Sequence, residues 1–331
     1  MDAAGRPLVL ALAGVACISS SAVVMRLAGT SASITAVGRC LFALPVLGGL
    51  VAVERRRGGA PLPPRSRWLA RLSGLFLASD LIVWSHSIAA IGAGLGTVVP
   101  SLQVLVVSVL GWALLGERPR RSLLLASPVM LGGLVLVGGL TGAHAYGAHP
   151  AAGVAEGIAV AGLYAIYIFT LRQATAGRDE AGRAPSPVAA LYEATLGATA
   201  GSVVLGLVLR DFTLRDVHVG PALGWLVLLA LTSQVLGWLL ITMSMPKLPA
   251  WMIGALLLTQ PAGSIALGYL ILSERPSLSQ LAGVALMLAG VLVVVTGRAP
   301  QHEDETPGAG RVQREVVVEV AVPGDGGEPA G

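Results

Sequence analysis

The chain has 331 residues, of which 54% are hydrophobic and only 12% are charged. Soluble domains carry about twice that charged fraction, so the composition excludes an ordinary soluble protein and predicts an integral membrane protein. The net charge of +4 comes almost wholly from arginine, and no basic patch is interleaved with aromatic residues, so we expect no nucleic-acid partner.

Ten long apolar runs follow one another along the chain and predict an all-α bundle of ten transmembrane helices. The runs are too long and too uniformly apolar for the strands of about 10 alternating residues that build membrane barrels. They cover about residues 8–25, 34–53, 69–88, 94–115, 123–140, 153–171, 188–209, 222–244, 250–272 and 278–296. Residues 299–331 are rich in Glu, Asp, Gly and Pro instead, which predicts a disordered cytoplasmic tail.

The fourth and ninth runs close with the same tripeptide, Glu-Arg-Pro. The two tripeptides lie 157 positions apart, and an offset of 154 or 157 also aligns polar and aromatic residues inside the runs. The aligned pairs are Asp80 with Gln234, Trp84 with Trp238, Gln103 with Gln260, Gly111 with Gly268, and Glu117-Arg118-Pro119 with Glu274-Arg275-Pro276. The sequence therefore predicts a duplicated five-helix unit, with a first repeat over residues 1–145 and a second over residues 146–298.

The distribution of positive charge gives the orientation of these repeats. An odd number of helices per repeat makes the second copy enter the membrane from the opposite side, so the repeats are inverted. With the amino terminus in the cytoplasm and the tail left out, cytoplasmic segments carry fourteen Arg and Lys residues and outer segments carry four. Because cytoplasmic loops favour positive charge, this bias predicts a multi-pass protein of the cell membrane, in contact with lipid, with both termini cytoplasmic.

Each half ends its fourth helix in Gly-Glu-Arg-Pro or Ser-Glu-Arg-Pro and continues into a helix rich in small residues. Together with the segment Gly38 to Ala43 in the second run, this arrangement resembles the EamA type of the drug/metabolite transporter superfamily over about residues 7–297. The resemblance implies ten helices in two inverted repeats. It also implies a secondary transporter that exports small metabolites, such as amino acids or related amphipathic compounds, by alternating access.

Asp80 is the ionisable residue placed deepest in the predicted membrane. It lies about 11 residues into its run, or about 17 Å at about 1.5 Å per residue, which is near the middle of a bilayer. A carboxylate at that depth is expected to couple transport to protons or to contact a substrate amine, and the alternative is a structural ion pair or hydrogen bond. Trp84 follows one helical turn later on the same face.

Arg39, in the second run, is closer in predicted depth to Asp80 than to Glu193, its own counterpart in the repeat. We therefore predict that Arg39 and Asp80 are the coupling residues, although a direct ion pair between them would compete with free titration of Asp80. Glu193 is expected near the inner surface, where it would pair with Arg172 or extend to water.

Gln103 and Gln260 are each the only long polar side chain in their runs, and both lie near mid-helix. Inverted repeats place equivalent positions about an axis in the membrane plane, so we expect both glutamines at similar depth. The predicted substrate-binding residues of this central cavity are Asp80, Trp84, Gln103, Gln234, Trp238 and Gln260. Amide and carboxylate groups would bind polar substrate atoms, and the indoles would supply apolar walls. The alternative is that the glutamines join helix to helix.

Glycines in the last run of each half predict close contacts between helices: Gly132, Gly133, Gly138 and Gly139 in the fifth run, and Gly283 and Gly290 in the tenth. A face for a homodimer is the alternative use of the same residues.

Two other functions stay open on the residues alone. Asp80, His86 and an adjacent serine, Ser85 or Ser87, contain the residue types of an intramembrane hydrolase. However, Asp80 and His86 are roughly 240° apart around a helix, and no Gly-x-Ser-x-Gly elbow occurs. A structural membrane protein is the second alternative. His144 and His149 are more typical of a solvated loop than of a metal site, so we expect no metal. We also expect no cofactor and no enzyme activity.

Overall fold

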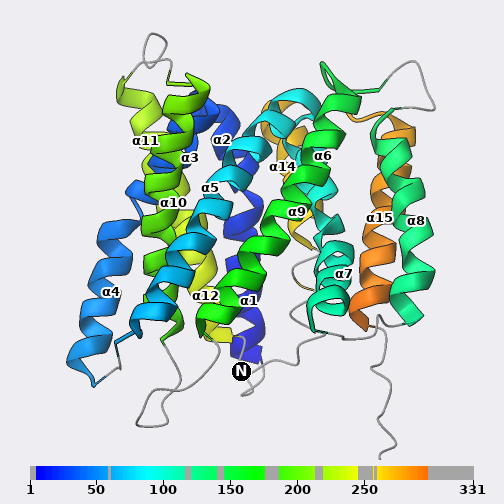
Figure 1. The fold of residues 1–331 in the computed structure, drawn as a ribbon. Helices are drawn as coiled ribbons and strands as arrows, with labels where there is room; N and C mark the ends of the chain where they lie inside the picture. The colour runs from blue at the N-terminus through cyan, green and yellow to red at the C-terminus, as the bar shows by residue number, and fades with distance from the viewer. Residues whose placement is uncertain are drawn as a thin grey trace, which may run out of the picture. The chain divides into compact units, whose positions relative to one another are not determined.

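A computed structural model describes residues 5–58, 61–115, 121–139, 145–175, 186–212, 219–244, 256 and 259–296. Within these ranges every regular element is helical, and the helices run side by side, up and down one bundle (Figure 1). They are α1 (Gly5–Ser19), α2 (Ser21–Ala28), α3 (Ala32–Leu41), α4 (Leu44–Arg56), α5 (Pro64–Ile91), α6 (Ala93–Val98), η1 (Val99–Leu102), α7 (Gln103–Leu115), α8 (Arg121–Val137), α9 (Pro150–Thr175), α10 (Pro187–Leu209), α11 (Val219–Leu229), η3 (Ala230–Gly237), α12 (Trp238–Ser244), α14 (Thr259–Leu272) and α15 (Leu278–Thr296). The expectations for Glu117-Arg118-Pro119, His144 and the tail 299–331 lie outside the described residues.

Six helical stretches are long and apolar enough to cross a membrane: Pro7–Ala28, Ala32–Arg56, Pro64–Ile91, Pro150–Thr175, Pro187–Leu209 and Gly220–Ile241. Shorter apolar helices cover Ala93–Val106, Ser122–Val137 and Leu278–Val294. The ninth predicted run, 250–272, falls partly outside the described residues. Large apolar side chains also point outward, with Leu125, Val208 and Leu270 each more than 70% exposed. A surface of this kind suits lipid, so the chain is a multi-pass membrane protein.

Several of the predicted runs are interrupted in the middle. The run 94–115 divides into α6, the 3₁₀ segment η1 and α7, because Pro100 has no N–H to continue the helix. The run 34–53 divides between α3 and α4, and the run 222–244 contains the π-helical segment η3. Such interruptions are frequent at functional sites. Gln103 begins α7 just after one of them, and Gln234 lies inside another.

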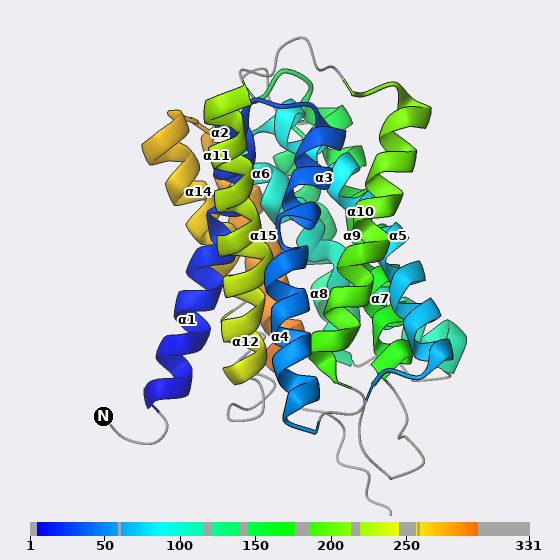
Figure 2. The same ribbon diagram turned by 90° about the vertical axis from the view of Figure 1, so that its left-hand side faces the viewer.

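Helix packing repeats when the two halves are exchanged. Helix α5 packs against α9 and α10, while its counterparts α11, η3 and α12 pack against α1, α2 and α3. Helices α6 and α14 pack against each other, as do α8 and α15, which lie side by side at one edge of the bundle (Figure 1). The view in Figure 2 shows α1, α12 and α4 along another face. The packing is therefore that of two structurally related halves.

The contact between α8 and α15 confirms the close approach predicted at Gly133, Gly283 and Gly290, but a methyl group on Gly132 would meet nothing within 4 Å, and Gly138 and Gly139 do not face α15. A methyl group on Gly133 would lie 2.5 Å from the carbonyl oxygen of Gly283 and 2.8 Å from Cγ of Met287. On the other side, Gly290 faces Met130 in the same way. Both methionines are fully buried, so the small residues let the two helices approach closely. The homodimer face stays a prediction.

Candidate functional site

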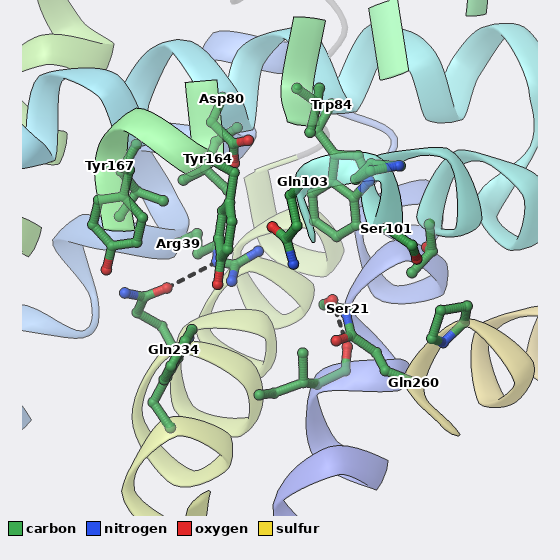
Figure 3. Close-up of a pocket in the computed structure, with 18 of the residues that line it drawn as sticks. Ser21, Arg39, Asp80, Trp84, Ser101, Gln103, Tyr164, Tyr167, Gln234 and Gln260 are labelled. Atoms are coloured by element: carbon green, nitrogen blue, oxygen red, sulfur yellow. Dashed lines mark hydrogen bonds between the residues drawn. The ribbon is translucent and has the colours of Figure 1, made fainter. Parts of the chain in front are cut away.

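A cavity of about 240 Å³ lies among α3, α5, α9, η3 and the broken segment α6–η1–α7. All seven residues proposed from the sequence line it: Arg39, Asp80, Trp84, Gln103, Gln234, Trp238 and Gln260. Figure 3 shows how residues far apart in the chain meet there, with Gln234 and Gln260 from one half facing Asp80 and Gln103 from the other. The fold thus brings the aligned positions of the two repeats into a single site.

Arg39 is 6% exposed and has two neighbours in the cavity. Its Nε donates a hydrogen bond of 3.0 Å to Oε1 of Gln234, and its Cζ lies 5.9 Å from the ring centroid of Trp84, within the range of a cation–π contact. The Nη1 atom has no hydrogen-bond partner. The direct ion pair with Asp80 considered from the sequence is not formed, because Gln234 holds Nε and Trp84 lies against the guanidinium.

Asp80 is 4% exposed, and its Oδ1 atom has no hydrogen-bond partner. A buried carboxylate without partners is costly, and the cost is higher inside a membrane. The cavity therefore contains one guanidinium and one carboxyl group, each with an unpaired polar atom. A bound ligand or a proton is suited to satisfy such atoms.

The aromatic walls come from both predicted and unpredicted residues. Trp84 Nε1 donates a hydrogen bond of 2.9 Å to the carbonyl oxygen of Gly96, which fixes the indole against α6. Tyr164 and Tyr167 on α9 add a tilted ring pair with centroids 5.5 Å apart. Sequence reasoning missed these two tyrosines, although their spacing of three puts them on one helix face.

Gln103 and Gln260 face the cavity (Figure 3). Neither side chain forms a hydrogen bond with another of the residues that the structure describes. Among the described residues, then, neither glutamine joins helix to helix, and the substrate-binding role stays a prediction.

Glu193 and His86 lie outside the cavity lining. Glu193 pairs with Arg71 of α5 at 2.8 Å, and α10 packs against α5. The predicted pairing with Arg172 falls on a side chain outside the described part of the structure. His86 forms a hydrogen bond through Nδ1 to the carbonyl oxygen of Ile82 in its own helix. Asp80, His86 and Ser87 are not assembled as a hydrolase would need, since Ser87 donates to the carbonyl oxygen of Gly153.

A bundle of apolar helices around a buried cavity with charged, amide and indole groups defines a multi-pass membrane protein able to hold a small solute. The family model described as "EamA-like transporter family" matches residues 5–139 and 153–296. The chain belongs to the EamA-like transporter family of the drug/metabolite transporter superfamily, whose members are secondary transporters and typically not enzymes.

The fold also matches solved structures. One of them, titled "Crystal structure of protein", is 20% identical with a TM-score of 0.56, and the match covers 87% of this chain and 96% of that chain. At this identity the likeness supports the fold alone. A search of curated proteins found no match.

Proposed function

We propose that the protein exports small metabolites, amino acids or related amphipathic compounds, across the cell membrane by alternating access. Its ten helices would form two inverted repeats, 1–145 and 146–298, with both termini and the tail 299–331 in the cytoplasm. Membership of a transporter family supports this proposal, as do the exchange symmetry of helix packing and the bias of arginine toward one side.

The observation that carries the proposal is a pair of buried ionisable side chains in one cavity, each with an atom that lacks a hydrogen-bond partner: Arg39 Nη1 and Asp80 Oδ1. In this account Arg39 binds an anionic group of the substrate, such as a carboxylate. Asp80 binds a substrate ammonium group or a coupling proton.

The other cavity residues would position the rest of the substrate. The amides of Gln103, Gln234 and Gln260 supply hydrogen bonds, and the indoles of Trp84 and Trp238 supply apolar walls. A volume of about 240 Å³ is below the ~300–1,000 Å³ usual for drug-sized ligands, which favours a small metabolite.

Counterflow in proteoliposomes tests the proposal. Purified protein is reconstituted with an internal excess of one unlabelled metabolite, and uptake of its labelled form is followed over a panel of amino acids, carboxylates and amines. Empty liposomes and Arg39→Gln protein are the controls. Uptake that depends on the internal solute supports a transporter, whereas chemical conversion of a panel compound would indicate a hydrolase. A structural protein would give neither, and that result would overturn the proposal.

A further inference from the structure

Glu274 lies just beyond α14, in the second Glu-Arg-Pro tripeptide, and reaches into the other half of the chain. Its Oε1 accepts a hydrogen bond from the backbone N–H of Ala93 at 2.7 Å, and its Oε2 accepts one from the N–H of Gly94 at 3.1 Å. Only 2% of Glu274 is exposed. Its own N–H donates to the carbonyl oxygen of Gly268 at 3.1 Å, so backbone and side chain are both fixed.

The local chain is shaped for this contact. Ala93 and Gly94 begin α6, and the first N–H groups of a helix have no partner within the helix, so a carboxylate satisfies them well. Gly92 has φ +90°, and a methyl group there would lie 3.0 Å from Cδ of Glu274. A methyl group on Gly268 would lie 2.5 Å from Oε2. Larger residues at either position would push the carboxylate away.

This contact lies about one helical turn beyond the cavity. Trp84 of α5 and Thr97 of α6 line the cavity, whereas Ile88 and Ala93, one turn further along their helices, are at most 2% exposed. Helices α6 and α14 lie together at this end of the bundle (Figure 1). Ile88 and Ala93 are therefore two buried residues between the cavity lining and the Glu274 contact.

A second loop covers the same place. Tyr146 would touch a methyl group on Gly92, and its backbone N–H and carbonyl oxygen both bond to the side chain of Gln280. Burial and the nearby Glu274 carboxylate raise the pKa of Tyr146. The loop that contains Tyr146 thus covers Glu274 on the side that faces away from the cavity.

We propose that Glu274 is a latch between the two halves, and that its carboxylate must release the N–H groups of Ala93 and Gly94 before solute can pass this end of the cavity. The inference rests on the proposed function, which places this end outside the cell. Both hydrogen bonds join residues 180 or more positions apart, so any rocking of one half against the other at this end must break them.

The cavity wall gives the latch a connection to the substrate. Trp84, which would contact bound solute, donates to the carbonyl oxygen of Gly96 in α6, two residues after Gly94. A solute that shifts the indole would therefore act on the same short helix that the latch holds.

Sided labelling of a cysteine in the cavity tests the latch. Cys17 and Cys40 are replaced by alanine, Ser101→Cys is introduced as the reporter, and an impermeant thiol reagent is applied to each face of oriented membrane vesicles. Glu274→Gln keeps the size of the side chain but replaces one acceptor oxygen with an NH₂ group that faces a backbone donor. In the Glu274→Gln protein, we expect labelling of the reporter cysteine from the outer face to rise about tenfold. A charge-assisted hydrogen bond of this kind changes an equilibrium constant by about that factor.

Glu156→Gln is the matched control, because Glu156 on α9 forms no hydrogen bond with α6 and its replacement should leave sidedness unchanged. Gly92→Ala is a second latch variant and should act like Glu274→Gln, since it crowds the carboxylate without removing it. Equal outer labelling in both latch variants and in the parent would overturn the latch. Labelling needs no known substrate, so this outcome is separate from a failure of counterflow.

Discussion

Arg39 and Gln234 form a hydrogen bond of 3.0 Å across the two halves of the chain, from Nε to Oε1. Gln234 is the repeat counterpart of Asp80, so one position holds an amide in one half and a carboxylate in the other. The amide holds the arginine. As a result Asp80 shares the cavity with a cation without being paired to it.

Gln234→Leu should lower the stability of the protein. The substitution leaves a buried guanidinium N–H without its acceptor, which costs about 2 kcal/mol. Thermal unfolding in detergent measures the effect, with Gln103→Leu as the control because Gln103 forms no hydrogen bond with other described residues. Equal melting temperatures for the two variants would contradict this role of Gln234.

Asp80→Asn should abolish the pH dependence of transport. Asparagine keeps the size and hydrogen-bonding capacity of the side chain but cannot titrate, so flux should become flat with pH while the protein still inserts. Flux is measured between pH 5 and pH 9 in variant and parent. An unchanged pH profile at normal expression would mean that Asp80 is not the coupling residue.

Gly132 and Gly133 are adjacent in α8, but we expect their replacement by alanine to have different effects on the free energy of unfolding. A methyl group on Gly133 meets the carbonyl oxygen of Gly283 at 2.5 Å, whereas one on Gly132 meets nothing within 4 Å. We expect Gly133→Ala to lose about 1–3 kcal/mol of unfolding free energy through overpacking. Gly132→Ala should lose nothing, since alanine favours a helix more than glycine. Denaturant unfolding decides, and equal effects would be inconsistent with the observed α8–α15 contact.

The repeat made the cavity residues predictable from sequence. An offset that aligns Asp80 with Gln234 and Gln103 with Gln260 also selects positions that face a common centre, and the structure brings them together. Tyr164 and Tyr167 were not predicted as cavity residues, because the sequence of an apolar helix does not indicate which neighbouring helix its tyrosines face. The sequence therefore predicted some, but not all, of the residues that line the cavity.

Contacts within the site were harder to predict than its members. The Arg39–Gln234 bond in the site, like the Arg71–Glu193 pair outside it, depends on side-chain reach and on how helices are broken. Depth estimated at 1.5 Å per residue assumes straight helices, whereas η3 is π-helical and Pro100 breaks the fourth run. The break at Pro100 was readable from the sequence, and the π-helical segment was not.

The orientation of the chain in the membrane is expected to place the arginine-rich segments in the cytoplasm. A cysteine at Ala148, an exposed position before α9, should react with an impermeant thiol reagent in intact cells. One at Arg57, exposed after α4, should react only after the cells are opened. The reverse pattern would place the termini outside and overturn the proposed orientation.

Substrate affinity in Gln103→Leu and Gln260→Leu proteins, measured by counterflow beside their melting temperatures, tests the central claim most directly. Both side chains face the cavity without a hydrogen bond to other described residues, so their loss should cost the substrate about one hydrogen bond, or about tenfold in affinity. The melting temperatures should stay within about 2 °C of the parent protein, since neither substitution removes a hydrogen bond to a described residue. Lower melting temperatures with unchanged affinity would contradict a substrate site in this cavity.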